Sequence, residues 1–307
     1  MYTIPPIELT PVESFSTLVT RARIHKSYYD YNPSRTLAII ATALYATTCT
    51  LHILQVARYR AWYFSVIIVA GLMETFGYAT RVLSQADVFS RGLFIAQFSL
   101  VVLAPVLIAA ASYILFGRLL ETVLPGGRNA RSLGVPARWV TWIFLTGDIT
   151  SFVLQGIGAG IMSGASGGTN MKKMNTGRDV MLTGLAVQIV TFGFFIAATV
   201  RFDFKSRSLA TLGLARPRWR ILLWALYASS VLIMVRSCYR VAEFSQGWTG
   251  YLASHEVYFY CLEALPMFPC FVIFNIFHPS RLLDTVGKED VVVEEGSGVG
   301  SMEEMKV

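Results

Sequence analysis

The sequence predicts an all-α integral membrane protein, a seven-transmembrane-helix bundle with its N-terminus outside and its C-terminus in the cytoplasm. Of the 307 residues, 54% are hydrophobic and only 15% are charged, whereas soluble domains usually carry about 25% charged residues. The hydrophobic residues occur in long runs rather than in short alternating stretches, as expected of helices that cross a bilayer. The Lys and Arg residues lie mainly between these runs, which is typical of membrane-protein loops.

Seven apolar runs, called spans here, are candidates for transmembrane helices, which need about 20 residues each. They are Thr36–Ala57, Trp62–Leu83, Gly92–Leu119, Trp139–Met162, Val180–Val200, Trp219–Arg240 and Val257–Phe277. Trp62, Trp139 and Trp219 each begin an even-numbered span. Because tryptophan favours the membrane interface, we expect these three side chains to share one aromatic belt.

The second and third spans contain polar side chains that a lipid-facing helix would avoid. Glu74 lies near the middle of the second span, Arg81 near its end, and Gln97 opens the third span. Glu74 and Arg81 are seven residues apart, and a helix rises about 1.5 Å per residue. They therefore lie roughly 10 Å apart along the helix axis, too far for an ion pair within the helix. Pro105 and Pro266 are expected to kink the third and seventh spans, as membrane helices tolerate where neighbours or water satisfy the freed backbone groups.

The fourth span combines polar and small residues in the stretch DITSFVLQGIGAG. Asp148, Ser151 and Gln155 recur at i, i+3 and i+7, so they share one face of the helix. This face is expected to form one wall of a polar cavity. Small residues that follow it allow close helix packing, and these are Gly156, Gly158 and Gly160.

The sixth span ends in charged residues. Only fifteen uncharged residues, Ile221–Val235, precede Arg236, fewer than the roughly 20 that a crossing needs, so Arg236 and Arg240 are expected in its last turns. Arg240 and Glu243 are spaced to pair at i, i+3, whereas Arg236 has a like charge at i+4 and needs an acid from another helix. The candidate acids are Glu74, Glu256 and Glu263.

Depth along the antiparallel spans places most of these groups in one half of the bilayer, the outer half in the predicted orientation. Glu74 lies near mid-depth, and Asp148 lies nearer the inner half. A charge at the bilayer centre costs about 2.5–3.5 kcal/mol on insertion scales, so the groups must pair, face water, or both. We therefore predict a substrate-binding site in the membrane. Its candidate residues are Glu74, Arg81, Gln97, Asp148, Gln155, Arg236, Arg240, Glu243, Glu256 and Glu263.

The alternative role for these charges is to staple helices together or to reach the interface. For the three charges nearest the interface, stapling and ligand contact are equal alternatives. These three are Arg240, Glu243 and Glu256. For the deeper charges, a place in or beside a water-accessible cavity is favoured. These are Glu74, Asp148, Arg236 and Glu263.

The distribution of Lys and Arg sets the predicted orientation. These residues are more numerous after the odd-numbered spans, and the more basic side should be cytoplasmic, although Arg21–Arg35 give the first span a basic leading flank. We expect an extracellular or lumenal segment at 1–35, a transmembrane domain at 36–280 and a disordered acidic tail at 281–307. No signal peptide is expected, because the first 35 residues lack a short apolar core with a cleavage site.

Several function classes lack support in the sequence. The net charge of +7 does not indicate a nucleic-acid partner, because the arginines lie between apolar runs. The four cysteines form no C-x-x-C and are expected to be small core residues. Of the four histidines only His52 lies well inside a span, so no metal site is expected. No hydrolase elbow or phosphate-binding loop motif occurs. The prediction is a protein that is not an enzyme and has no cofactor.

Seven blocks in order resemble the fungal lipid-translocating exporter family, also called RTA-like proteins, and together they cover about residues 29–283. The blocks are YNPS from Tyr31, ETFGYATR from Glu74, QFSLVVLAPVLIAAASYILFGR from Gln97, DITSFVLQGIGAG from Asp148, RSCYRVAEFSQGWTG from Arg236, HEVYFYCLEALPM from His255 and HPSRLL from His278. This resemblance implies seven-span proteins that move sphingoid long-chain bases or related toxic amphiphiles, sterol analogues or porphyrins among them.

The resemblance also implies resistance by export at the plasma membrane, an internal membrane being the alternative. Membrane lipids and amphiphilic small molecules are the expected partners. A cationic sphingoid amine would bind Glu74, Glu256 or Glu263, whereas an anionic headgroup would bind an arginine. The alternative function is a seven-transmembrane receptor or membrane stress sensor with an outward-facing ligand pocket. An absence of cysteines suited to an extracellular disulfide in the loops argues against the receptor.

Overall fold

The computed structural model describes most of the predicted transmembrane domain. The described residues are 33–86, 90–124, 131–132, 135–165, 171–211, 219–247 and 250–282. Nearly all of the predicted N-terminal segment 1–35 and of the predicted tail 281–307 lies outside them. Seven helices in this part are long and apolar enough to cross a membrane. The predicted seven-helix fold is therefore confirmed, while the predicted orientation stays a prediction.

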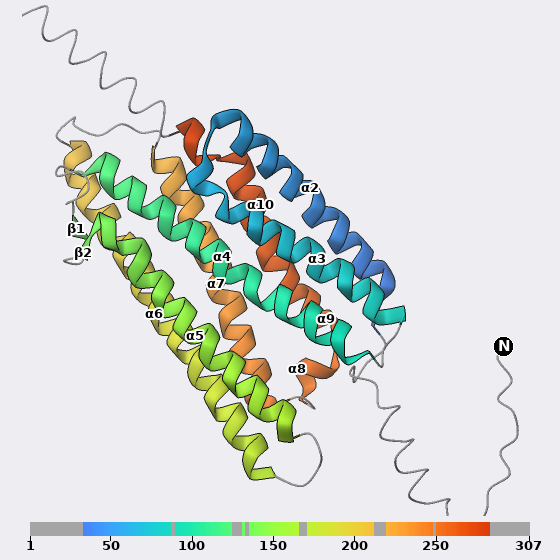
Figure 1. The fold of residues 1–307 in the computed structure, drawn as a ribbon. Coiled ribbons are helices and arrows are strands. Elements are labelled where there is room, and N and C mark those ends of the chain that lie inside the picture. The colour runs from blue at the N-terminus through green and yellow to red at the C-terminus, as the bar shows by residue number, and fades with distance from the viewer. Residues whose placement is uncertain are drawn as a thin grey trace, which may run out of the picture.

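The long helices follow one another up and down the bundle (Figure 1). They are α2 (Arg35–Tyr59), α3 (Val66–Ala86), α4 (Arg91–Val123), α5 (Ala137–Ala165), α6 (Met171–Thr211), α7 (Trp219–Gln246) and α10 (Leu265–Ile276). Short elements connect or extend them, namely η1 (Trp62–Phe64), β1 (Arg131–Ser132), β2 (Val135–Pro136), α8 (Tyr251–Ser254), α9 (Glu256–Tyr258) and the π-helical turn η3 (Phe259–Ala264). The two strands form a two-residue antiparallel ladder.

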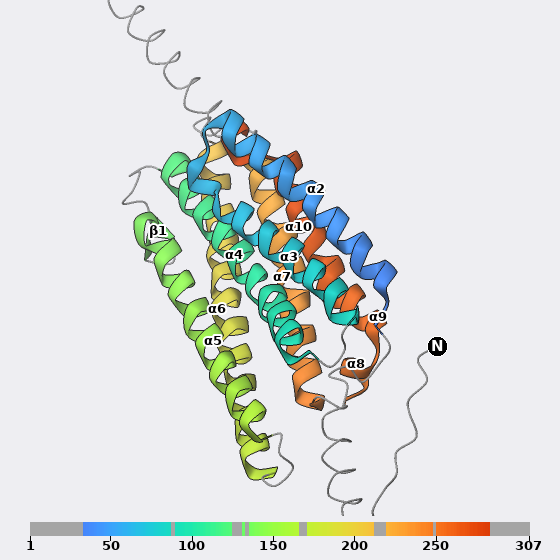
Figure 2. The same ribbon diagram turned by 45° about the vertical axis from the view of Figure 1, so that its right-hand side comes forward.

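The bundle has two groups of helices with two helices between them. Helices α2, α3 and α10 form one group, and α5 and α6 form a long pair on the other side (Figures 1 and 2). Helix α4 contacts α3 and α5, while α7 contacts α6 and α10, so α4 and α7 join the two groups. The last spanning segment is made of α9, η3 and α10 in succession.

Aromatic rings fill the centre of the bundle between α4, α6 and α7. Phe195 packs edge-on against Tyr113 and Phe116, and Phe202 packs edge-on against Phe116 and Trp219. Such edge-to-face pairs add about 0.5–1.5 kcal/mol each beyond the area that they bury. They hold α6 against α4 and against the Trp219 end of α7.

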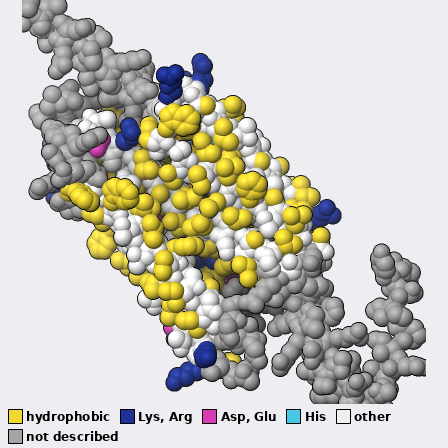
Figure 3. Space-filling view, viewed as in Figure 1, with side chains coloured by type: hydrophobic (Ala, Val, Ile, Leu, Met, Phe, Trp, Pro, Cys, Tyr) yellow, Lys and Arg dark blue, Asp and Glu magenta, His cyan; other side chains and the backbone are white. Residues whose placement is uncertain are grey.

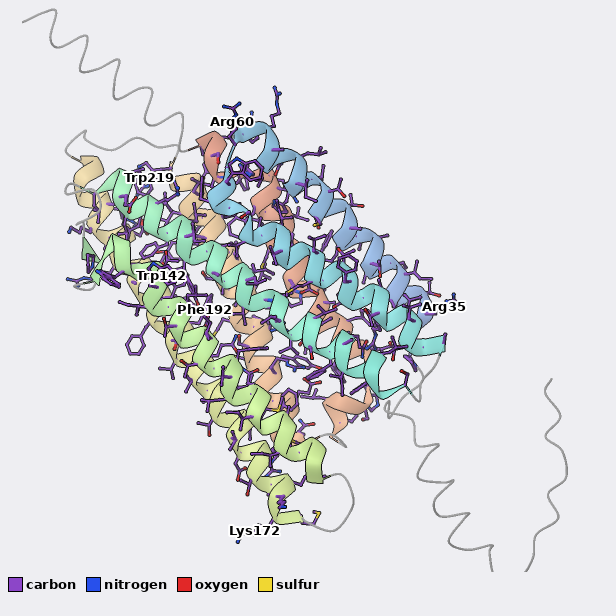
Figure 4. The ribbon with its side chains drawn as sticks, viewed as in Figure 1. Arg35, Arg60, Trp142, Lys172, Phe192 and Trp219 are labelled. Carbon is purple, nitrogen blue, oxygen red and sulfur yellow. The ribbon has the colours of Figure 1, made fainter. Side chains whose placement is uncertain are left out.

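The outside of the bundle is apolar, as expected of a surface that meets lipid. Hydrophobic side chains cover the middle of the face seen in Figure 3, and Lys and Arg lie mainly towards its ends. Leu54, Phe194 and Trp224 are each more than 60% exposed. Arg60 and Trp219 mark one end of the bundle, whereas Arg35 and Lys172 lie towards the other (Figure 4).

Three details of the sequence prediction were wrong. Helix α6 has 41 residues, far more than Val180–Val200, because its polar ends continue the helix beyond the apolar centre. Trp219 is only 2% exposed and packs in the core, so it does not join Trp62 in an interfacial belt. Cys238 and Cys261 are exposed, unlike the two buried cysteines, so they are not core residues.

Candidate functional site

Seven charged residues form the candidate site, which we call the charged cluster. They are Glu74, Arg81, Arg236, Arg240, Glu243, Glu256 and Glu263. They come from α3, α7, α9 and η3, at the end of α7 that lies away from Trp219. Ion pairs join α7 to η3 and α3 to α9.

The shortest ion pair of the cluster joins α7 to η3. Arg236 Nη2 lies 2.6 Å from Glu263 Oε1, and the same nitrogen donates to the carbonyl oxygen of Val101 on α4 at 3.3 Å. Both charged side chains are at most 5% exposed. Glu263 lies in the π-helical turn, three residues before Pro266. A π turn widens the helix locally and is frequent at functional sites.

Arg240 lies one turn after Arg236 and contacts two acids. Its Nη1 is 2.9 Å from Glu243 Oε2 within α7 and 3.8 Å from Glu263 Oε2. The guanidinium also lies over the rings of Phe98 and Phe244, at 5.1 and 4.5 Å from their centroids. Arg240 is therefore held by charge on one side and by aromatic faces on the other, a common arrangement for arginine.

A second interhelical ion pair ties α3 to the start of the last span. Arg81 Nη2 lies 2.9 Å from Glu256 Oε1, and Arg81 Nε donates to the hydroxyl of Tyr260 at 3.2 Å. The ring of Phe259 lies 4.4 Å below the guanidinium. The other carboxylate oxygen of Glu256 accepts from the backbone N–H of Ser34 at 2.8 Å. Glu256 thus joins the beginnings of α2 and α9 to the end of α3.

Glu74 is the acid of the cluster that makes no ion pair within the described part of the chain. It is 1% exposed, and its Oε2 has no hydrogen-bond partner there. The charges of Arg236 and Glu263 both act on it, so it lies beside their ion pair. Four carboxylates face three guanidinium groups in the cluster. Glu74 is therefore the carboxylate that remains for a cation.

Bonding capacity remains elsewhere in the cluster. Three of its atoms, Arg236 Nε, Arg240 Nη2 and Glu263 Oε2, are buried and have no hydrogen-bond partner among the described residues. The same holds for the hydroxyl of Tyr78, a neighbour of the cluster on α3. A buried polar group without a partner costs about 1–3 kcal/mol. Water or the polar headgroup of a ligand would relieve this cost, and the cluster therefore suits a ligand with both donors and acceptors.

Three predicted site residues lie apart from the ion pairs. Asp148 accepts a hydrogen bond from the hydroxyl of Tyr113 at 2.7 Å. Gln155 donates to Ser151 and to Gln188 of α6. Gln97 is buried on α4 and makes no side-chain hydrogen bond within the described part of the chain. The polar face of the fourth span therefore binds α4 and α6, and its place in the substrate site is a prediction that no contact tests.

Sequence reasoning missed the aromatic residues around the arginines. Phe98, Phe259 and Tyr260 contact Arg240 or Arg81, although each looks like an ordinary apolar residue of its span. Ser34 was also missed, because its contact with Glu256 uses the backbone N–H. Helical spacing does offer one signal, since Phe244 is one turn from Arg240.

No metal centre is formed by the described residues. Among them, no three His, Cys, Asp or Glu side chains are grouped so as to hold an ion. His52 is fully buried, and its Nε2 lies 3.1 Å from the carbonyl oxygen of Phe271. This contact joins α2 to α10 and accounts for the polar side chain inside the first span.

Comparison with known proteins gives a consistent picture. Residues 67–285 match the protein family described as RTA1 like protein. Protoporphyrin uptake protein 1 of Saccharomyces cerevisiae is 39% identical over 67% of this chain, which spans only 65% of that relative's length. Protein RTA1 of the same species is 29% identical, with 88% of this chain and 90% of the relative covered.

A further relative is the sphingoid long-chain base transporter RSB1 of Saccharomyces cerevisiae, which is 27% identical over 85% of this chain and 76% of its own length. No solved structure matches the chain. The family match begins in α3 and ends beyond α10, so it contains every residue of the charged cluster.

Proposed function

Since this chain belongs to the RTA1-like protein family, we propose that it transports amphiphilic lipids or related amphiphiles across a membrane. The family match covers residues 67–285. Relatives named as a sphingoid long-chain base transporter and a protoporphyrin uptake protein support an amphiphilic cargo. We propose sphingoid long-chain bases as the first substrate class to test, with sterol analogues and porphyrins as the others.

The observation that carries this proposal is the unpaired carboxylate of Glu74 beside the Arg236–Glu263 ion pair. A sphingoid base has a protonated amine and hydroxyl groups at one end of a long hydrocarbon chain. The amine would pair with Glu74, and the hydroxyls would bond to the free atoms of Arg240 and Glu263. An anionic headgroup would instead have to displace a carboxylate from an arginine.

The hydrocarbon chain of such a substrate would stay in contact with lipid. Apolar side chains close in sequence to the cluster point outwards, and these are Phe76, Leu83, Val257 and Leu265, each 58–65% exposed. In this proposal the headgroup moves from the lipid headgroup region into the cluster, while the hydrocarbon chain slides along the apolar surface of α3 and α9–α10. A hydrocarbon chain that stays in lipid incurs no transfer free energy. Only the polar headgroup, which is costly to place in an apolar environment, needs a protein site.

The wider setting of this transport is also part of the proposal. The cluster lies towards the predicted outer side, which suits export from the cell and resistance to toxic amphiphiles. The plasma membrane is the proposed location. Transport of this kind makes and breaks no covalent bond, so no enzyme activity or cofactor is assigned.

A reconstituted transport assay tests the proposal. Purified protein in liposomes should accelerate the transbilayer movement of a labelled sphingoid base. Glu74→Gln should slow it by about tenfold, because a lost charge-assisted contact of about 1.5–3 kcal/mol corresponds to a tenfold effect or more. As a control, Glu121→Gln should transport like the wild type, because Glu121 lies near the C-terminal end of α4 and outside the cluster.

Two results would contradict transport. If the protein accelerates no amphiphile of a panel of sphingoid bases, sterol analogues and porphyrins, it is not a translocase of this kind. If it binds an amphiphile through Glu74 without moving it, the receptor alternative replaces the proposal. Equal rates in Glu74→Gln and Glu121→Gln would leave transport standing but remove Glu74 from the site.

A further inference from the structure

A second polar site lies at the opposite end of α7 from the charged cluster. A hollow of about 260 Å³ opens between α6 and α7. Its lining consists of Asp203, Arg207, Arg220, Leu223, Trp224 and Tyr227. Arg220 and Arg236 are 16 residues apart on one helix, which at about 1.5 Å per residue places them roughly 24 Å apart. This hollow is therefore separate from the candidate transport site.

The hollow has two arginines in its lining but one acid to pair with them. Arg207 contacts Asp203 through two nitrogens, Nε at 3.2 Å and Nη2 at 2.7 Å. Asp203 is the acid of the lining, so this pair neutralises one of the two guanidinium groups. Arg220 makes no ion pair or hydrogen bond within the described part of the chain. The lining therefore carries one net positive charge.

The other lining residues add donors and an apolar floor. The hydroxyl of Tyr227 makes no hydrogen bond among the described residues, and the charges of Asp203 and Arg207 act on it. Trp224 is 69% exposed, and its ring packs edge-on against Tyr227 at 6.1 Å. Leu223 is buried beneath them. Arginine, a free hydroxyl and an exposed indole form a set that suits an anion at a membrane surface.

The position of the hollow adds a second attraction for an anion. Helix α7 begins at Trp219, so Arg220 lies in its first turn, where the helix dipole favours negative charge. Arg60 and Trp219 mark this end of the bundle (Figure 4). The positive-inside rule assigns this end to the cytoplasm, and the cytoplasmic leaflet carries the anionic lipids of a cell membrane.

We propose that the hollow between α6 and α7 binds the phosphate group of a molecule whose net charge is negative. Arg220 and the Tyr227 hydroxyl contact the phosphate oxygens, and Arg207 stays paired with Asp203. The phosphate comes from the headgroup of an anionic phospholipid whose chains lie beside Trp224, or from free phosphate. This assignment does not depend on the proposed transport function.

Native mass spectrometry of the full-length chain tests the site. Detergent-solubilised protein is titrated in parallel with phosphatidylserine, with phosphatidylcholine and with inorganic phosphate. We expect phosphatidylserine to bind, and Arg220→Gln to weaken that binding about tenfold, the effect of losing about 1.4 kcal/mol. Tyr227→Phe, which removes only the hydroxyl, should weaken it about threefold. Arg201→Gln, an exposed residue of α6 outside the lining, should bind like the wild type.

The outcomes separate the sources of the phosphate. Binding of phosphatidylserine but not of inorganic phosphate assigns the site to a lipid, and binding of both assigns it to phosphate in general. If phosphatidylcholine binds equally well, or if Arg201→Gln weakens binding as much as Arg220→Gln, the proposal is wrong. The protein would then attract anions through its overall charge and not through this hollow.

Discussion

At the scale of single residues, the cluster shows how a membrane protein keeps several charges out of water. Removing a charge from water costs several kcal/mol, and one partner alone repays it only with good geometry and further hydrogen bonds. Arg236 has both, with Glu263 at 2.6 Å and a backbone carbonyl at 3.3 Å. Glu74 has neither in the described part of the chain. This difference is the reason for proposing a structural role for the Arg236–Glu263 pair and a ligand contact for Glu74.

Breaking the Arg236–Glu263 pair should therefore destabilise the protein more than changing Glu74. We expect Arg236→Met to lower the free energy of unfolding by about 3–5 kcal/mol, because it leaves Glu263 buried without its main partner. The double variant Arg236→Met/Glu263→Leu should recover much of this loss. Denaturant unfolding in mixed micelles measures both values.

An exposed ion pair serves as the control for this prediction. Arg178 and Asp179 lie 3.8 Å apart with side chains 38% and 69% exposed, so Arg178→Gln should cost less than about 1 kcal/mol. A loss in Arg236→Met no larger than that of Arg178→Gln would show that the buried pair does not stabilise the fold.

The sequence predicted part of this residue network. Helical spacing correctly predicts the Arg240–Glu243 pair, and charge repulsion correctly sends Arg236 to another helix for its acid. Spacing could not choose between three candidate acids, because that choice depends on how helices pack. The sequence could not identify the partner of Arg81 either. Glu256 is 175 positions away, and only the packing of the helices brings the two together.

At the scale of the elements, the close packing of α5 against α6 depends on particular glycines. A Cβ atom on Gly158 would lie 2.6 Å from both the carbonyl oxygen of Gly177 and the backbone nitrogen of Met181. Backbone atoms cannot move aside as a flexible side chain can. Gly156, two residues earlier, has open space around it. The sequence indicated close packing for the whole glycine run, but only the facing position provides it.

Gly158→Ala should therefore force α5 and α6 apart, whereas Gly156→Ala should not. We expect Gly158→Ala to cost about 1–3 kcal/mol, as overpacking usually does. Gly156→Ala should be neutral or stabilising by up to about 1 kcal/mol, because alanine favours helix more than glycine does. Thermal unfolding of the two variants, side by side in one detergent, makes the comparison. Equal melting temperatures would contradict this account of the packing.

The lengths of the elements explain which boundaries the sequence could predict. Apolar runs mark the part of each helix inside the bilayer, so Trp139–Met162 was predicted well. The polar ends of α6 lack an apolar run that would mark them as helix. A helix that continues beyond the bilayer meets water there, so its residues need not be apolar. The π turn at Phe259–Ala264 was not predicted either. Its position one turn before Pro266 suggests the missing proline N–H as a local cause.

At the scale of the whole molecule, the cluster and the hollow lie at opposite ends of α7. A molecule with this arrangement offers a mixed-charge site to one leaflet and a net positive site to the other. If the basic end faces the cytoplasm, the charged cluster lies in the outer half of the membrane. The direction of insertion therefore decides how both proposals apply in a cell.

Cysteine labelling determines this orientation. The four native cysteines are first replaced by alanine, and one new cysteine is placed at either end of the bundle. Lys172 and Arg58 are both exposed, and Lys172 lies at the end opposite Arg60 (Figure 4). We expect Lys172→Cys to react with a membrane-impermeant maleimide on intact cells, and Arg58→Cys to react only after permeabilisation. The excess of basic residues at the Arg58 end predicts this result, whereas the reverse pattern would place the cluster in the cytoplasmic half and contradict the predicted orientation.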